Sequence, residues 1–135
     1  MNDNERYKQG IAVRSEVLGE EHVSRSIHKL NDFNDDFQNF ITRFAWGEVW
    51  SRPGLTRHTR SLVTIAILLG LCREAELRMH LRACFNNGVT KEELKELILH
   101  CSLYAGLPTA NAAMHMAEEV FEALDIQPEK VNQDL

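Results

Sequence analysis

Several features that mark common protein classes are missing from this chain of 135 residues. Its three cysteines, Cys72, Cys84 and Cys101, are odd in number and form no C-x-x-C pair. This argues against a disulfide framework and against a thioredoxin-like redox pair. There is no glycine-rich phosphate loop, no G-x-G-x-x-G or G-x-S-x-G motif, and no lysine within an apolar segment. Nucleotide, flavin and pyridoxal enzymes are therefore disfavoured, and we expect no cofactor.

Long apolar runs and an excess of basic residues are also missing. The net charge is −5, which disfavours nucleic acid as a partner because phosphate binding requires a basic face. The longest apolar stretch, 62–72, is too short to cross a bilayer, which takes about 20 residues. The first ten residues, MNDNERYKQG, lack the apolar core of a secretory signal, so we expect a cytoplasmic protein without a membrane partner.

What the sequence does contain is helical spacing, with almost no alternating strand pattern. We predict a single all-α domain over 1–135, a bundle of about six to seven helices with an N-terminal helical arm over 1–30 and a loose tail over 125–135. The helices are expected over 4–18, about 20–30, from 34 or 35 through 44, 56–71, 74–87, from the capping box at 90–93 to about 105, and 108–124.

Apolar residues in these helices suggest what each one buries. Phe37, Phe40, Ile41 and Phe44 stand at core spacing. The inner side of the helix after the capping box is expected to carry Leu94, Leu97, Ile98, Cys101 and either Leu103 or Tyr104. The stretch 62–69 has no polar face, so its helix should be buried on all sides. A chain of this length has few places to bury such a helix, so we predict a homo-oligomer with this helix near the subunit contact.

A cluster of basic residues precedes the apolar stretch. Arg57 and Arg60 are three residues apart and share a helix face, with Arg52 and His58 close by. They lie in the first turn or so of the predicted helix, where free N–H groups and the helix dipole also favour an anion. The pattern indicates a carboxylate-binding site. The alternative is salt bridging to acids such as Glu48, or a solvated face.

A second candidate group is Glu76, His80 and Cys84, which are spaced four residues apart on one helix. Glu76 could orient the imidazole of His80 and raise its pKa, which would make His80 a proton donor near neutral pH. All three residue types also bind zinc, but no second histidine stands at metal-binding spacing, so we predict no metal site. The alternative is a surface Glu–His pair.

Three further residues could contact a ligand. Trp50 adjoins the Ser-Arg-Pro-Gly turn and could form the floor of a pocket, whereas Trp46 is the better core candidate. Asn87 and Tyr104 could donate hydrogen bonds, although Asn87 before a glycine is also an ordinary helix end.

Three segments, WGEVWSRPGLTRHTRSLVTIAILLGL, ELRMHLRACFNNGVTKEEL and YAGLPTANAA, resemble signature segments of the carboxymuconolactone decarboxylase family. With VLGEEHV, the resemblance covers nearly the whole chain. It implies the all-helical fold shared with alkylhydroperoxidase D-like proteins and a ring-like homo-oligomer, a hexamer. It also implies decarboxylation of 4-carboxymuconolactone to β-ketoadipate enol-lactone without a cofactor, in the protocatechuate branch of the β-ketoadipate pathway.

The redox relatives that the resemblance brings in carry C-x-x-C-x-x-x-H, and here that spacing falls on Arg73, Glu76 and His80. The histidine is kept and both cysteines are gone, so a thiol peroxidase is disfavoured. The implied substrate is a dianion. Arg57 and Arg60 would hold it and stabilise a dienolate oxygen, and His80 would deliver a proton. A decarboxylase for another lactone or β-keto acid, or a non-enzymatic carboxylate-binding protein, stays open.

Overall fold

The structure, a computed structural model, describes residues 1–132, and all of the regular secondary structure in that range is helical. The elements are α1 (Asp3–Leu18), α2 (Glu20–His28), α3 (Asp35–Ile41), the π-helix η1 (Thr42–Val49), α4 (Arg57–Gly70), α5 (Glu74–Ala83), the 3₁₀ helix η2 (Cys84–Asn87), α6 (Lys91–Ala105) and α7 (Leu107–Ala123). The all-α prediction is confirmed. The predicted tail, 125–135, ends in residues 133–135, which lie outside the described part.

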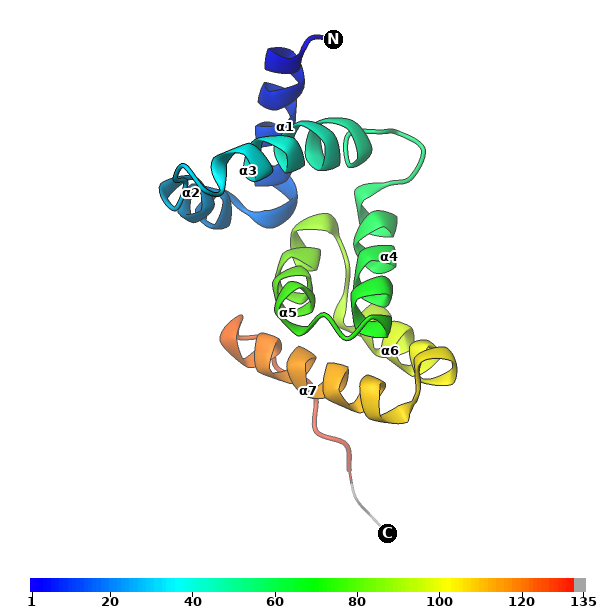
Figure 1. Ribbon diagram of the computed structural model, residues 1–135. Helices are drawn as coiled ribbons and strands as arrows, with labels where there is room; N and C mark the ends of the chain where they lie inside the picture. Colours follow the sequence, from blue (N-terminus) through cyan, green and yellow to red (C-terminus); the bar gives the residue numbers. More distant parts are fainter. Residues whose placement is uncertain (133–135) are drawn as a thin grey trace.

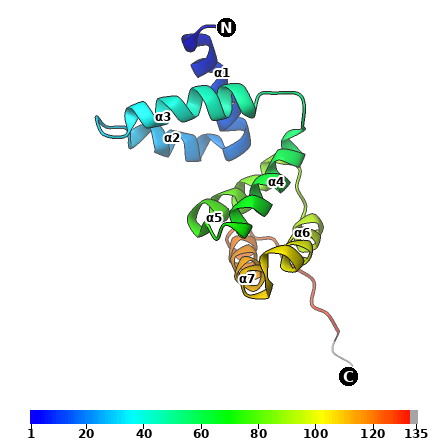
Figure 2. The same cartoon turned by 45° about the vertical axis from the view of Figure 1, so that its right-hand side comes forward.

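The helices form two groups that are joined by the loop before α4. Figures 1 and 2 show α1 crossing the continuous helix formed by α3 and η1 in the first group, which also holds α2, and α4 to α7 packed in the second. Each group has its own hydrophobic cluster. The larger cluster lies among α4 to α7 around Ile65, Leu81 and Ile98, and the smaller one centres on Val17, Val23 and Trp46. Ala83 of α5 belongs to the smaller cluster, so α5 and η2 connect the two groups.

The helices α1 and η1 approach each other backbone to backbone. A Cβ atom added to Gly10 would lie 1.9 Å from the carbonyl oxygen of Thr42, and one added to Gly47 would lie 2.4 Å from that of Arg6. Only glycine leaves room for this contact. Within η1 the hydrogen bonds span five residues, as in the 2.9 Å bond from Trp50 N to Ala45 O. A π-helix is rare and occurs mostly near functional sites.

The phenylalanines of α3 and η1 are exposed, so the prediction that Phe37, Phe40 and Phe44 are core residues is wrong. Ile41 is partly buried against the smaller hydrophobic cluster. The phenylalanines are exposed because the contact with α1 takes the opposite face of the same helix. Thr42 and Trp46 are the buried residues there.

The helix α4 begins where predicted, with Thr56 Oγ1 accepting a 3.2 Å hydrogen bond from Thr59 N. Its inner face buries Ile65 and Leu69, but Val63 and Ile67 on the outer face are exposed. The single chain therefore does not bury this helix on all sides, and the subunit contact expected to cover its outer face stays a prediction. The single chain leaves an apolar face that only another molecule could cover.

The capping box of α6 is confirmed, because Thr90 and Glu93 exchange hydrogen bonds of 3.0 and 3.1 Å with each other's backbone N–H groups. Leu94 and Ile98 are buried as predicted. Leu103 and Tyr104 are exposed, so their predicted inner position is wrong. Across residues 1–132, no helix is both long and apolar enough to cross a membrane.

Candidate functional site

A ladder of three stacked rings leads from the smaller core to His80. Trp46 and Trp50 stack with ring centroids 5.0 Å apart, and the planes of Trp50 and His80 lie within 14° at 6.4 Å. The π-helix places the two tryptophans on this side, and His80 comes from the last turn of α5. The structure thus brings together two of the predicted site residues, Trp50 and His80, from separate segments.

The imidazole of His80 is nearly buried, with 9% of the residue exposed. Burial, the largest effect, and a positive charge on His22 together lower its pKa to about 4, and Glu76 only partly opposes this. Glu76 is exposed, and in the described residues no hydrogen bond joins it to His80. The prediction that Glu76 raises the pKa of His80 to near neutrality is therefore wrong, and His80 is neutral at pH 7.

The two arginines in the first turn of α4, Arg57 and Arg60, differ in their interaction partners. Arg57 is paired with Glu16 of α1, so its charge is already compensated. Arg60 donates a 3.2 Å hydrogen bond from Nη2 to the carbonyl oxygen of Arg52, and its buried Nε has no acceptor. Within residues 1–132, Arg60 makes no ion pair with a carboxylate. Of the two arginines that the spacing treats alike, Arg60 is the one with capacity left for an anion.

Asn87 supports the start of α4 from η2. Its amide nitrogen donates to Ser61 Oγ at 3.0 Å and to the carbonyl oxygens of Val17 and Ala83 at 3.4 Å. Ser61 is buried and directly follows Arg60. The amide nitrogen is thus used to tie α1, α4 and η2 together, which leaves the amide oxygen for a ligand.

Sequence reasoning missed three residues that this geometry makes important: Glu16, His22 and Ser61. Glu16 acts on Arg57, His22 on His80 and Ser61 on Asn87. Each pair is far apart in the sequence, and no motif links its members. Tyr104, by contrast, lies at the end of α6, where it is 82% exposed and its ring contacts that of His100. No described contact joins it to Trp50 or His80.

The cysteines have no arrangement suited to redox chemistry. Cys84 is buried, donates to Leu81 O at 3.1 Å, and burial raises its pKa to about 12. Burial also raises the pKa of Cys101. A thiol that stays protonated is a poor nucleophile. Within the described range, no three His, Cys, Asp or Glu side chains gather where a metal ion could be held.

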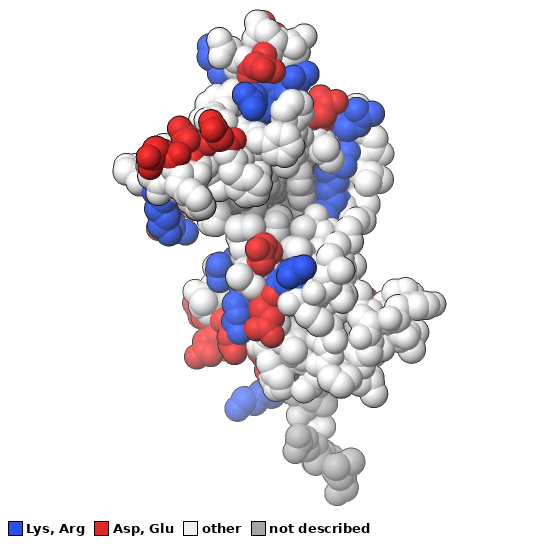
Figure 3. Space-filling view, in the orientation of Figure 1, with Lys and Arg blue, Asp and Glu red and all other residues white. Residues whose placement is uncertain are grey.

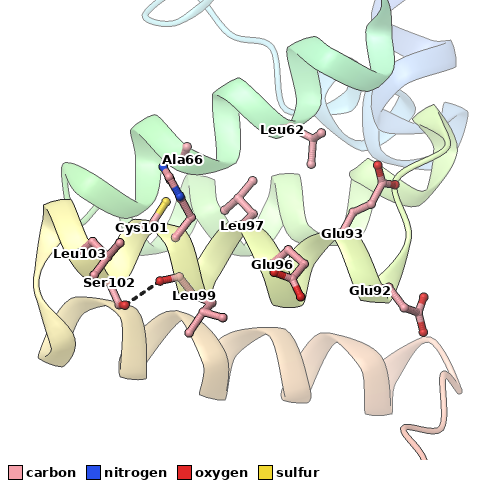
Figure 4. A pocket seen from close by; sticks show the side chains of 11 residues that line it. Leu62, Ala66, Glu92, Glu93, Glu96, Leu97, Leu99, Cys101, Ser102 and Leu103 are labelled. Atoms are coloured by element: carbon pink, nitrogen blue, oxygen red, sulfur yellow. Dashed lines mark hydrogen bonds between the residues drawn. The ribbon is translucent and has the colours of Figure 1, made fainter.

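A large open pocket lies elsewhere, between α4 and α6. It measures about 820 Å³ and contains none of the predicted site residues. Figure 4 shows Leu62 and Ala66 on the α4 side, Leu97 and Cys101 on α6, and acidic side chains at the start of α6. Glu92, Glu93 and Glu96 line it, and three carboxylates would repel an anionic substrate. An apolar groove of this kind suits a protein contact better than a small dianion.

Known proteins resemble this chain over most of its length. The model of the "Carboxymuconolactone decarboxylase family" matches residues 35–119. A "4-carboxymuconolactone decarboxylase" of Acinetobacter baylyi is 81% identical over 134 residues, 99% of this chain and 100% of that protein. A "Nitrosuccinic acid decarboxylase npaB" of Metarhizium robertsii is 41% identical over 113 residues, 84% of this chain and 79% of that protein.

Proposed function

The chain belongs to the carboxymuconolactone decarboxylase family, and we propose that it decarboxylates 4-carboxymuconolactone to β-ketoadipate enol-lactone. The observation that carries this is the 81% identity to the enzyme of that name along essentially its whole length. The step belongs to the protocatechuate branch of the β-ketoadipate pathway. The fungal relative is also named a decarboxylase but for a different acid, so the second candidate is the same reaction type on another substrate.

The chemistry needs no external electron sink. Loss of CO₂ leaves an electron pair that can spread through the ring's double bond onto the lactone carbonyl, and a proton then adds to carbon. The protein must hold the remaining carboxylate, stabilise the dienolate oxygen and supply that proton. Each task can be matched to a side chain near the ring ladder.

Arg60 is the proposed anion-binding group, for the retained carboxylate and for the developing dienolate oxygen. Its position at the start of α4, its lack of a carboxylate partner in the described residues and its unused Nε all support this role. A planar guanidinium can bind a carboxylate through two N–H groups at once. Arg57 is the proposed second contact, at the edge of the site, and would have to share its charge with Glu16.

His80 is the proposed proton-transfer group. It is neutral in the free protein because it is buried, but two negative charges on a bound substrate favour the protonated imidazole. Substrate binding would therefore raise the pKa of His80, and no hydrogen bond to Glu76 is needed. Glu76 contributes only the weaker long-range attraction that already opposes the effect of burial.

The remaining site proposals concern position rather than chemistry. Trp50, which is half-buried and stacked on His80, would contact the lactone ring beside the imidazole. Asn87 would orient Ser61 and the start of α4 through its amide nitrogen and could offer its oxygen to a ligand. Tyr104 stays a predicted ligand that is exposed in the single chain.

The proposal includes a homo-oligomer, a hexamer by resemblance, in which the outer face of α4 is covered by a second copy. Support comes from the exposed Val63 and Ile67 and from the apolar groove beside them. It also includes a cytoplasmic location, which the three unpaired cysteines favour because thiols persist in reducing compartments.

The test is to follow the ultraviolet absorbance of freshly generated 4-carboxymuconolactone with the purified protein. Arg60→Ala should lower kcat by about 100- to 1,000-fold, the typical effect of removing one donor to developing charge. His80→Ala should lower kcat by about 100- to 10,000-fold through loss of proton transfer. Arg25→Ala, at an exposed arginine on α2, is the matched control and should keep wild-type turnover.

Two outcomes would contradict these assignments. Near-normal kcat in both His80→Ala and Arg60→Ala would show that other groups carry the reaction. Wild-type protein without activity on this lactone, but with CO₂ release from another lactone or β-keto acid, would support the second candidate.

A further inference from the structure

Three exposed phenylalanines follow one line along α3 and η1, and a fourth, Phe33, lies in the turn just before α3. Phe33, Phe37, Phe40 and Phe44 are 94%, 64%, 54% and 39% exposed, and we call them the phenylalanine seam. They are four, three and four residues apart, the spacing of the apolar positions of a coiled coil. The rings of Phe40 and Phe44 are in contact with centroids 5.1 Å apart, so the line continues into the π-helix.

The seam cannot be covered by its own chain. The opposite face of the same helices is already packed against α1 through Thr42, Trp46 and Gly47. Turning the phenylalanines inward would therefore bring the buried face out. Contiguous aromatic surface of this kind on a folded chain marks a contact with another molecule.

The charges beside the seam indicate which molecule. Asp32, Asp35 and Asp36 lie at its beginning, and Arg43 lies near its end with its guanidinium 5.8 Å from the ring centre of Phe44. In the part of the chain that the structure describes, none of these four charged residues forms an ion pair. Figure 3 shows acidic side chains gathered over the start of α3. Both signs of charge occur toward the far end of η1, where Glu48 pairs with Arg6 and Arg52.

This pattern is complementary to itself when one copy is reversed. In an antiparallel pair, the acidic beginning of each seam meets the basic end of the other, whereas a parallel pair would set aspartates against aspartates. We propose that two copies of this chain pair through the phenylalanine seam about a two-fold axis, with Phe33 opposite Phe44 and Phe37 opposite Phe40. This surface is separate from α4, and two separate self-contacts generate a closed assembly larger than a dimer.

The first test measures the mass of the assembly by light scattering at one protein concentration. Phe37→Glu with Phe40→Glu should halve the wild-type mass while far-ultraviolet circular dichroism stays helical, because both side chains are exposed in the single chain. Val131→Glu makes the same change at an exposed residue outside the seam and should keep the wild-type mass. A helical double variant with the wild-type mass would overturn the proposal.

The second test fixes the direction of pairing and does not depend on a disruptive variant. In a Cys72→Ser background, Phe33→Cys combined with Phe44→Cys should give disulfide-linked dimers on a non-reducing gel, and each single substitution should not. Within one chain these positions are 11 residues apart, about 16 Å along a helix, too far for a disulfide. Dimers from the single variants would indicate parallel pairing, and absence of dimers from the double variant would exclude the seam as the interface.

Discussion

The burial of His80 makes the stability of the folded protein depend on pH. Burial lowers its folded-state pKa to about 4, whereas the pKa of an unfolded chain's histidine is near the ordinary value of about 6.5. Protons therefore bind more readily to the unfolded chain between these values. Above pH 6.5 the His80 ring is mostly neutral in both the folded and the unfolded chain, so it costs little stability. As the pH falls from 6.5 toward 4, the free energy of unfolding decreases.

The size of the effect follows from the two pKa values. Linkage gives a loss of about 2 kcal/mol of unfolding free energy between pH 7 and pH 5, and about 3 kcal/mol by pH 4. Other groups also titrate in this range, including His22, whose pKa is lowered by burial and by nearby positive charges. The contribution of His80 is therefore isolated by comparison with His80→Asn, which has no titrating side chain.

The assay is urea unfolding followed by far-ultraviolet circular dichroism at pH 7 and pH 5, with both proteins at one concentration. Wild type should lose about 2 kcal/mol more than His80→Asn. An NMR titration of the His80 ring in the intact protein should show a midpoint well below 6. Equal losses in the two proteins, or a midpoint near 6.5, would refute the argument from burial.

Two further predictions concern packing and thiol reactivity. Gly10→Ala should destabilise the protein by about 1–3 kcal/mol, because its Cβ would meet a backbone carbonyl at 1.9 Å. Gly70→Ala, with open space around it, should be neutral or stabilise by up to about 1 kcal/mol. Urea midpoints measure both changes, and a tolerated Gly10→Ala would contradict the backbone contact. A thiol reagent at pH 8 should modify the exposed Cys72 in the native protein and Cys84 only after unfolding, since Cys84 is buried with a pKa of about 12; equal rates by mass spectrometry would contradict this.

The sequence predicts the helices well where local chemistry sets their ends. The cap at Thr56, the box at Thr90 and the turn at Gly88, with φ of 83°, depend on neighbouring residues alone. The sequence does not reveal the π-helix, because its packing partner is α1. The contact is made through Gly10, which is far from η1 in the sequence. Periodicity also does not distinguish a surface that contacts a second chain from a face that packs into the core. For this reason the spacing predicts core positions for phenylalanines that are exposed.

The candidate site, too, can be predicted from the sequence only in part. Residue type and spacing single out Arg57, Arg60 and His80, but they cannot tell which arginine has a partner. Glu16 decides this from another helix. Spacing also suggests that Glu76 governs the pKa of His80, whereas burial is the larger effect and arises only when α5 packs into the fold.

The ring ladder has a practical consequence for every measurement on this protein. The chain has two tryptophans, and both stand in the stack that ends at His80. Its intrinsic indole fluorescence therefore comes from the candidate site alone. The protein carries an optical reporter of that site without any label, and emission will report a ligand there before it reports changes elsewhere.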